Sequence, residues 1–215
     1  MTIYTKHWAR RGVTLIEAVL FISIALGLIV GGLVFFQQAS LAARINDAVR
    51  SLSGMASETR AAYRTQQTFA GLTETVLISS GAVPSSQVRV NPVAGAGEGA
   101  TAFPNIIVNE WNNRVTIRPN AAATPAGSTV NQFLEITYTD IPVAACTRLA
   151  TATGGNGPIG PGIVSVRVVN SSAVPVTTVI GAVDLNGRAT ITPAAAATAC
   201  ATGDAPVDVT FTLAR

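Results

Sequence analysis

The chain of 215 residues has few charged side chains and almost none of the residues on which most enzymes depend. Asp, Glu, Lys and Arg make up 12% of it, about half the usual share for a soluble domain. The only lysine is Lys6 and the only histidine is His7. After residue 12, therefore, a Ser–His–Asp triad, a phosphate-binding loop with its lysine and a histidine-based zinc site are excluded. These absences argue against an enzyme, and the sequence predicts no cofactor and no metal site.

The excess of positive charge is confined to the start of the chain. The net charge of +3 arises from 14 basic and 11 acidic residues. Lys6, Arg10 and Arg11 account for the whole difference, because the remainder of the chain is balanced. The charge therefore describes a short basic N-terminal segment rather than a basic surface. Nucleic acid is not expected as a direct ligand.

Residues 13–36, directly after the basic segment, are almost wholly apolar. As a helix they would span about 36 Å, enough to cross a bilayer. The preceding positive charge predicts a cytoplasmic N-terminus and an exported remainder. A secretory signal peptide fits poorly, because the run is too long and no small-x-small cleavage site follows it. A plain single-pass anchor fits the length but leaves one residue unexplained.

That residue is Glu17, the only charged side chain between Arg11 and Arg44. A carboxylate without a partner in hydrocarbon costs at least about 3 kcal/mol, so an intramembrane acid is a candidate functional residue. It requires a cation, and the apolar segment supplies none. Cleavage after Gly12 would create an α-amino group at Val13, four residues before Glu17.

The stretch RRGVTLIE, residues 10–17, resembles the processing site of type IV prepilins, in which a basic leader ends in Gly before a long apolar helix. The resemblance implies that a prepilin peptidase cuts after Gly12 on the cytoplasmic side and methylates the new N-terminus at Val13. It also implies that Glu17 pairs with the Val13 amine of a neighbouring subunit during filament assembly. Members of the family often have Phe or Met as the first mature residue. Val13 is more similar to the type IVb branch, where this position varies.

Residues 37–66 continue the helical pattern with a single apolar stripe. The stripe consists of Leu41, Ile45, Val49, Leu52, Ala56, Thr59 and Tyr63, which recur every three or four residues. The pattern predicts one helix from about residue 14 to residue 66, about 80 Å long. Its apolar half should protrude and its amphipathic half should pack on a globular domain, as in pilins. Gly27, Gly31 and Gly32 interrupt the apolar half, and either close helix packing or local melting explains them.

From about residue 69 the composition shifts to Thr, Val, Gly, Pro and Asn, and short alternating runs predict strands. The predicted strands are Val76–Ser79, Ile106–Val108, Arg114–Arg118, Phe133–Thr139, Ile163–Val169, Val176–Val183, Thr190–Thr192 and Val207–Leu213. The predicted loops are 93–102, 120–129, 154–162 and 193–203. We expect an antiparallel sheet folded against the helix, which makes an α+β fold of the type IV pilin kind.

The two cysteines, Cys146 and Cys200, are expected to form a disulfide, because an exported domain with two cysteines usually pairs them. The bond would close a loop of about 55 residues, worth about 4 kcal/mol on the chain-entropy model. The alternative is two free buried thiols. Type IV pilins are similar in having a C-terminal disulfide that bounds a variable surface region. The segment 136–146, ITYTDIPVAAC, also resembles the approach to the first cysteine in thin-pilus type IVb pilins.

The sequence thus predicts a leader at 1–12, a filament-core helix at 13–36, an amphipathic helix at 37–68 and a β-rich head at 69–215, with the region 146–200 bounded by the disulfide. The resemblance implies a structural subunit of an extracellular type IV pilus, serving adhesion, aggregation or conjugative contact and catalysing nothing.

The implied partners are further copies of the chain, the prepilin peptidase, the inner-membrane pilus assembly machinery and, before assembly, the bacterial inner membrane. Two alternatives remain open. One is a minor pilin or a type II secretion pseudopilin, which shares the N-terminus without forming the bulk of the filament. The other is a single-pass membrane-anchored binding domain, which would keep an intact N-terminus.

Overall fold

The computed structural model describes residues 14–90, 105–120, 130–152, 163–170, 177–180, 191–201 and 206–214. The chain divides into two units, Met1–Ala42 and Ala43–Arg215. The predicted leader, with Gly12 and Val13, lies outside the described residues.

Helix α1 runs from Leu15 to Ala62, a length of 48 residues. The predicted single helix is therefore confirmed, although it ends four residues early, in a turn where the Tyr63 N–H donates to the Thr59 carbonyl at 3.1 Å. All large apolar side chains from Leu15 to Phe36 are half exposed or more. The first part of the helix, up to Ala42, thus contains no buried residue.

The part of α1 in the second unit packs on a sheet. Its buried side chains are Ile45, Ala48, Val49, Leu52, Met55, Ala56 and Thr59. The predicted stripe is confirmed from Ile45 through Tyr63, and the structure adds Ala48 and Met55 to it. Near the end of the helix, the Arg60 Nε donates to the Ala214 carbonyl at 2.9 Å. This bond fixes the last turns of α1 to the C-terminal end of the sheet.

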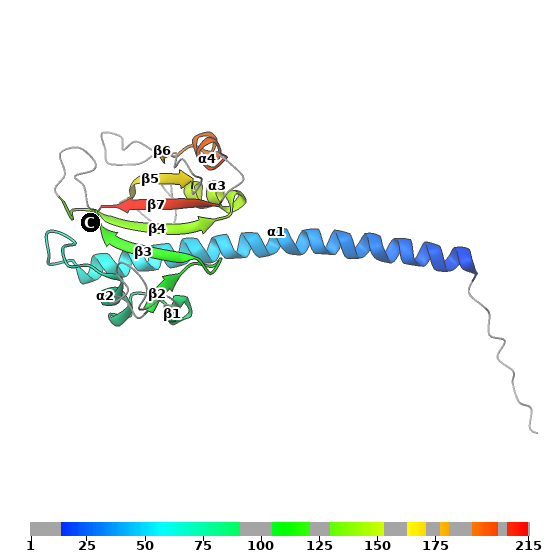
Figure 1. The fold of residues 1–215 in the computed structure, drawn as a ribbon, viewed down its shortest axis with the longest axis horizontal. Coiled ribbons are helices and arrows are strands. Elements are labelled where there is room, and N and C mark those ends of the chain that lie inside the picture. The colour runs from blue at the N-terminus through cyan, green and yellow to red at the C-terminus, as the bar shows by residue number, and fades with distance from the viewer. Residues whose placement is uncertain are drawn as a thin grey trace, which may run out of the picture. The chain divides into compact units, whose positions relative to one another are not determined.

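The sheet is wholly antiparallel in the described residues and has the order β1-β2-β3-β4-β7-β5-β6. The strands are β1 (Val88–Val90), β2 (Asn105–Val108), β3 (Arg114–Pro119), β4 (Leu134–Ile141), β5 (Ile163–Asn170), β6 (Thr177–Ile180) and β7 (Val207–Leu213). Strand β7 lies between β4 and β5 in the middle of the sheet (Figure 1). The last strand of the chain therefore joins the two parts of the sheet.

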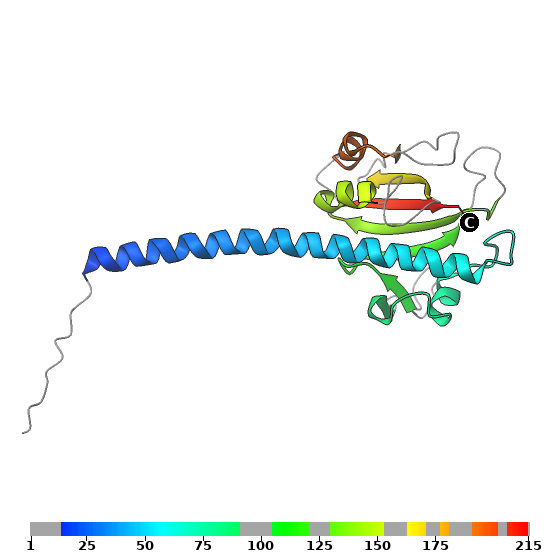
Figure 2. The same ribbon diagram turned by 180° about the vertical axis from the view of Figure 1, so that it is seen from behind.

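The two faces of the sheet differ in chemistry. On one face Ile136, Phe211 and Val166 pair across β4, β7 and β5, and all are fully buried. The residues of α1 after Ala42 and helix α3 (Val143–Ala152) lie on one and the same face of the sheet (Figure 2). On the other face Thr137 and Thr210 pair, with their hydroxyl oxygens 2.9 Å apart. The core therefore lies between the apolar face of the sheet and the helices.

Two predicted strands are wrong. The segment Val76–Ser79 belongs to helix α2 (Glu74–Ser79), because Thr73 caps it by accepting a hydrogen bond from the Val76 N–H at 3.3 Å. Near the predicted strand Thr190–Thr192, Thr192 instead caps helix α4 (Pro193–Cys200), which also replaces most of the loop predicted at 193–203. A threonine cap followed by proline in the first turn favours a helix start.

Other differences are smaller. Helix α3 and strand β1 were not predicted, whereas the strand predicted at Val176–Val183 is confirmed over Thr177–Ile180 and its other residues lie outside the described part of the chain. The strands predicted at 106–108, 114–118, 133–139, 163–169 and 207–213 are confirmed within about one or two residues at each end. The loops predicted at 93–102 and 154–162 lie outside the described residues, as does the loop predicted at 120–129 except for Asn120.

Candidate assembly site

Glu17 lies in the first turn of α1 with an exposed side chain. The Thr14 hydroxyl oxygen accepts a hydrogen bond from the Glu17 N–H at 3.4 Å. Thr14 and Glu17 therefore occupy the first and fourth positions of a capping box, and a carboxylate there is favoured by the positive end of the helix dipole. In the described part of the chain no basic group lies within ion-pair distance of Glu17.

The helix around Glu17 presents apolar side chains in every direction. Leu15 is 83% exposed, and Phe35, at the far end of the run, is 76% exposed. The most apolar 18-residue window has a mean hydropathy of 2.8 and no buried residue. By length and composition α1 can cross a membrane. Contiguous exposed apolar surface of this size marks a membrane or protein interaction site.

The glycines of this run meet no side chain among the described residues. A Cβ atom built on Gly27, Gly31 or Gly32 meets nothing within 4 Å. The described residues therefore do not distinguish the two explanations left by the sequence, close helix packing and local melting.

A polar network holds the second half of α1 against the sheet. The Tyr138 hydroxyl of β4 lies 3.0 Å from the Ser51 hydroxyl of α1. Ser51 also donates to Glu110 Oε1 at 3.2 Å, and Gln87 Nε2 donates to the same oxygen at 2.8 Å. Burial raises the pKa of Tyr138 and of Glu110. Four segments that are distant in sequence thus meet in one network.

A cavity of about 500 Å³ opens beside this network. Its charged lining comes from Asp47 and Arg50 of α1, from Arg89 of β1 and from Glu110 in the turn between β2 and β3. The lining combines both signs of charge and is therefore not a surface for a strongly charged ligand of one sign. The residues of this network carry no recognisable motif, so the sequence alone does not predict that they meet.

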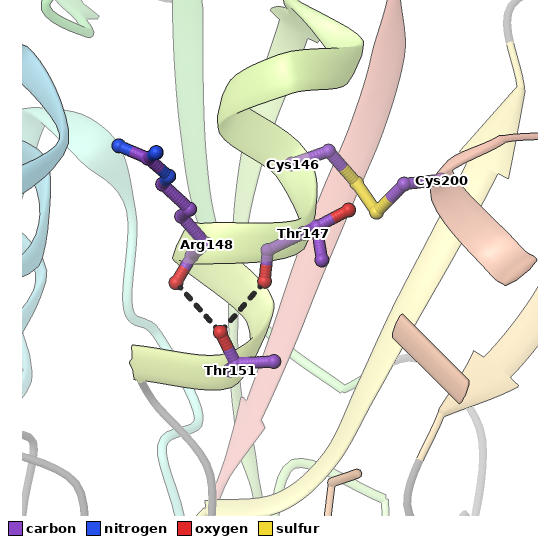
Figure 3. Close-up of a disulfide and its surroundings, with 5 residues drawn as sticks. All are labelled: Cys146, Thr147, Arg148, Thr151 and Cys200. Carbon is purple, nitrogen blue, oxygen red and sulfur yellow. Dashed lines mark hydrogen bonds between the residues drawn. A yellow bond between two sulfur atoms is a disulfide. The ribbon is translucent and has the colours of Figure 1, made fainter. Parts of the chain in front are cut away.

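The disulfide joins Cys146 of α3 to Cys200 of α4, as expected (Figure 3). Both cysteines are fully buried. Next to the bond, the Thr151 hydroxyl lies 2.8 Å from the Thr147 carbonyl and 3.2 Å from the Arg148 carbonyl (Figure 3). The bond ties together two short helices that the sequence analysis missed. The disulfide therefore links two helices rather than two loops. These helices contact strands β5, β6 and β7.

Comparison with known proteins identifies a family for most of the chain. The family model described as PilS N terminal matches residues 42–214. The major structural subunit of the bundle-forming pilus from Escherichia coli O111:H- is 26% identical over 202 residues, covering 94% of this chain and 93% of that protein. The corresponding subunit from Escherichia coli O127:H6 (strain E2348/69 / EPEC) gives the same identity and coverage.

Solved structures give the same result for the fold. The type IV b pilin from Salmonella typhi has a TM-score of 0.51 and 18% identity, and it covers 77% of this chain and 97% of its own. TcpA, a type IV pilin from Vibrio cholerae El Tor biotype, has a TM-score of 0.50 and 17% identity, with 79% and 98% covered. The long helix and antiparallel sheet therefore form the α+β fold expected from the sequence.

Proposed function

The chain belongs to the PilS N-terminal family, and from this premise we propose that it is the major structural subunit of a type IV pilus of the type IVb kind. The relatives that match nearly the whole chain are named major structural subunits of a bundle-forming pilus. The observation that carries the proposal is the apolar run Leu15–Phe36, which no part of its own unit buries and which precedes a pilin head. The role that we propose for the chain is structural, and we propose no catalytic activity for it.

Processing is the first step of this proposal. A prepilin peptidase cuts after Gly12 and methylates the new N-terminus at Val13, which releases the leader 1–12. The sequence RRGVTLIE supports the position of the cut. Helix α1 begins at Leu15, two residues beyond the proposed new N-terminus. The mature chain would therefore begin almost directly with its helix.

Assembly is the second step, and Glu17 directs it. Residues 13–36 form the filament core, and Glu17 binds the Val13 amine of the neighbouring subunit. A charge buried among apolar helices is tolerated only when it is paired and hydrogen-bonded. Within the described residues no cation reaches Glu17, so another copy of the chain is the natural source. The amphipathic helix at 37–68 and the head at 69–215 then lie outside this core.

Location follows from the same steps. The precursor spans the bacterial inner membrane with its N-terminus in the cytoplasm, and the assembled subunit forms an extracellular filament. The inner-membrane assembly machinery and other copies of the chain are its partners. The filament serves adhesion, aggregation or conjugative contact.

Mass spectrometry of sheared filaments tests this function. The expected mass is that of residues 13–215 plus one methyl group and minus two hydrogens for the disulfide. A variant with Cys146→Ser and Cys200→Ser should have the mass calculated for its own residues 13–215 plus one methyl group, without the loss of two hydrogens. Protein that keeps residues 1–12 in the filament, or that is absent from the filament, would overturn the proposal.

A further inference from the structure

Two buried oxygen atoms at the junction of α1 and the sheet accept no hydrogen bond from any described residue. They are Glu110 Oε2 and Gln87 Oε1. Their side chains already touch, because Gln87 Nε2 donates to Glu110 Oε1 at 2.8 Å. Buried polar atoms are almost always satisfied, and an acceptor without a donor carries a free-energy penalty. Two such atoms on two bonded side chains therefore require an explanation.

The donors around Glu110 are unevenly distributed. Oε1 accepts from both Ser51 and Gln87, whereas Oε2 accepts from no group in the described chain. The charged and titratable groups that face it are Asp47 and Arg50 from α1, Arg89 from β1 and Tyr138 from β4. Among the described residues neither arginine forms an ion pair with Glu110. Asp47 adds a second negative charge.

We propose that Glu110 is a neutral carboxylic acid in the folded chain at neutral pH and that its Oε2 hydroxyl donates to Gln87 Oε1. A protonated carboxyl has one O–H donor and keeps one carbonyl acceptor. One proton would therefore satisfy both orphaned oxygens at once. The two side chains then form a closed acid–amide pair, with Gln87 Nε2 donating to Oε1 and Glu110 Oε2 donating back.

The electrostatics of the site act in the same direction as the proposal. Burial raises the pKa of Glu110, and the nearby Asp47 raises it further. Hydrogen bonds from the backbone of Glu110 itself, from Ser51 and from Gln87 lower the pKa of Glu110, but the net shift is upward. A carboxyl with a raised folded-state pKa binds its proton more tightly when folded. The contribution of Glu110 to the free energy of unfolding is therefore complete at acid pH. It falls as the pH rises from the ordinary pKa of a glutamate in the unfolded chain through the raised pKa in the folded chain.

The pair lies where the head holds α1. Ser51 bridges the Tyr138 hydroxyl of β4 and the carboxyl of Glu110. When Glu110 ionises, Oε2 has no proton to donate to Gln87 Oε1, so the proposed second hydrogen bond of the pair is lost, and the charged carboxylate is held in a largely buried position beside Ser51. Rising pH therefore weakens the attachment of α1 to the sheet.

The variant Glu110→Gln tests the proposal in the full chain in detergent. Two amides can form the same closed pair, with one N–H donating in each direction, so the variant mimics the protonated acid. Its Tm at neutral pH should equal or exceed that of the unsubstituted chain. The fall in Tm on going to mildly alkaline pH should become smaller. The matched control is Glu58→Gln, because Glu58 is an exposed carboxylate of α1 that lies outside the network, and this substitution should leave that fall unchanged.

A spectroscopic measurement keeps the test independent of folding in the variant. Infrared difference spectra with isotope-labelled glutamate should show the carbonyl stretch of one protonated acid at neutral pH. The band should disappear on alkaline titration and be absent from Glu110→Gln. A neutral-pH spectrum without that band would overturn the proposal. So would a Glu110→Gln variant that folds but has a lower Tm at neutral pH, since an ionised Glu110 would then be the stabilising form.

Discussion

One helix contains two regions of opposite design. From Leu15 to Ala42, α1 carries a single charge and buries no residue within its unit, whereas from Ala43 to Ala62 it buries seven residues against the head. The backbone conformation is the same in both. The first region is apolar all round, as expected of a helix in lipid or among other helices, and the second has one apolar stripe. The pattern of apolar side chains, and not the helical backbone, therefore indicates which surface each region contacts.

The difference separates two measurable properties. The stability of the head depends on the second region, because its stripe completes the core. On the proposed function, filament formation depends on the first region, because its large apolar side chains stay exposed within its own unit and Glu17 has no ion pair among the described residues. Substitutions in the first region should therefore leave the stability of the head unchanged, and substitutions in the second region should leave the contacts between subunits unchanged.

The largest expected effect comes from Glu17→Ala. It should abolish filaments, seen by electron microscopy of sheared material, while the thermal unfolding of the head stays unchanged. The reason is that, on the proposed pairing, the Val13 amine of the next subunit would lose its counter-ion in an apolar environment. Thr14→Ala is the matched control, because it removes the cap acceptor and keeps the carboxylate, and it should still form filaments. Filaments of normal yield from Glu17→Ala would refute the assembly role.

Removing the disulfide should affect only the head. The double variant Cys146→Ser and Cys200→Ser should lower the free energy of unfolding by about 4 kcal/mol, since the closed loop is long. Urea titration followed by near-ultraviolet circular dichroism measures this loss. Association of the chain with membrane fractions should remain complete. A head of unchanged stability would show that packing around α3 and α4 suffices without the bond.

The same truncation in both regions sharpens the comparison directly. Leu52 is fully buried, and Leu52→Ala should lower the free energy of unfolding by about 2–5 kcal/mol. Leu26 is 57% exposed, and Leu26→Ala should change it by less than about 0.5 kcal/mol. Denaturant unfolding of both variants in the same detergent gives the two values. Equal losses would contradict the separation of the regions.

The smallest expected effect concerns glycine. A Cβ atom on Gly54 meets nothing within 4 Å, so Gly54→Ala should raise the free energy of unfolding by about 0.5–1 kcal/mol through helix propensity alone. The control Gly27→Ala should leave head unfolding unchanged, because it lies in the first region. A loss of stability in Gly54→Ala would indicate that the helix needs freedom at this position.

Much of the fold was predictable because its periodicities are strong. The stripe from Ile45 to Tyr63 and the alternation in β5 and β7 each follow from one repeated spacing. The errors fell on two short helices, of which α2 contains residues common in strands and α4 is an alanine-rich segment that was predicted as a loop. Helix α2 contains Val76 and Ile78, and helix α4 is mostly alanine and threonine. Their caps, Thr73 and the pair Thr192–Pro193, were the local signals that distinguish them from strands and loops.

The polar network was not predictable from spacing. Ser51 meets Glu110 from 59 residues away and Tyr138 from 87 residues away. Such pairs depend on the register between a helix and a sheet, which no local pattern encodes. The disulfide was predictable as a pair because the chain has only two cysteines. Its position between two helices was not.

The central place of β7 has a consequence for the order of events in the cell. This strand begins at Val207 and pairs with both β4 and β5. A nascent chain that stops short of it would have two separate partial sheets and no shared core. The complete sheet of the head can therefore form only after β7 has been synthesised. Products truncated before β7 should accordingly remain open to proteolysis.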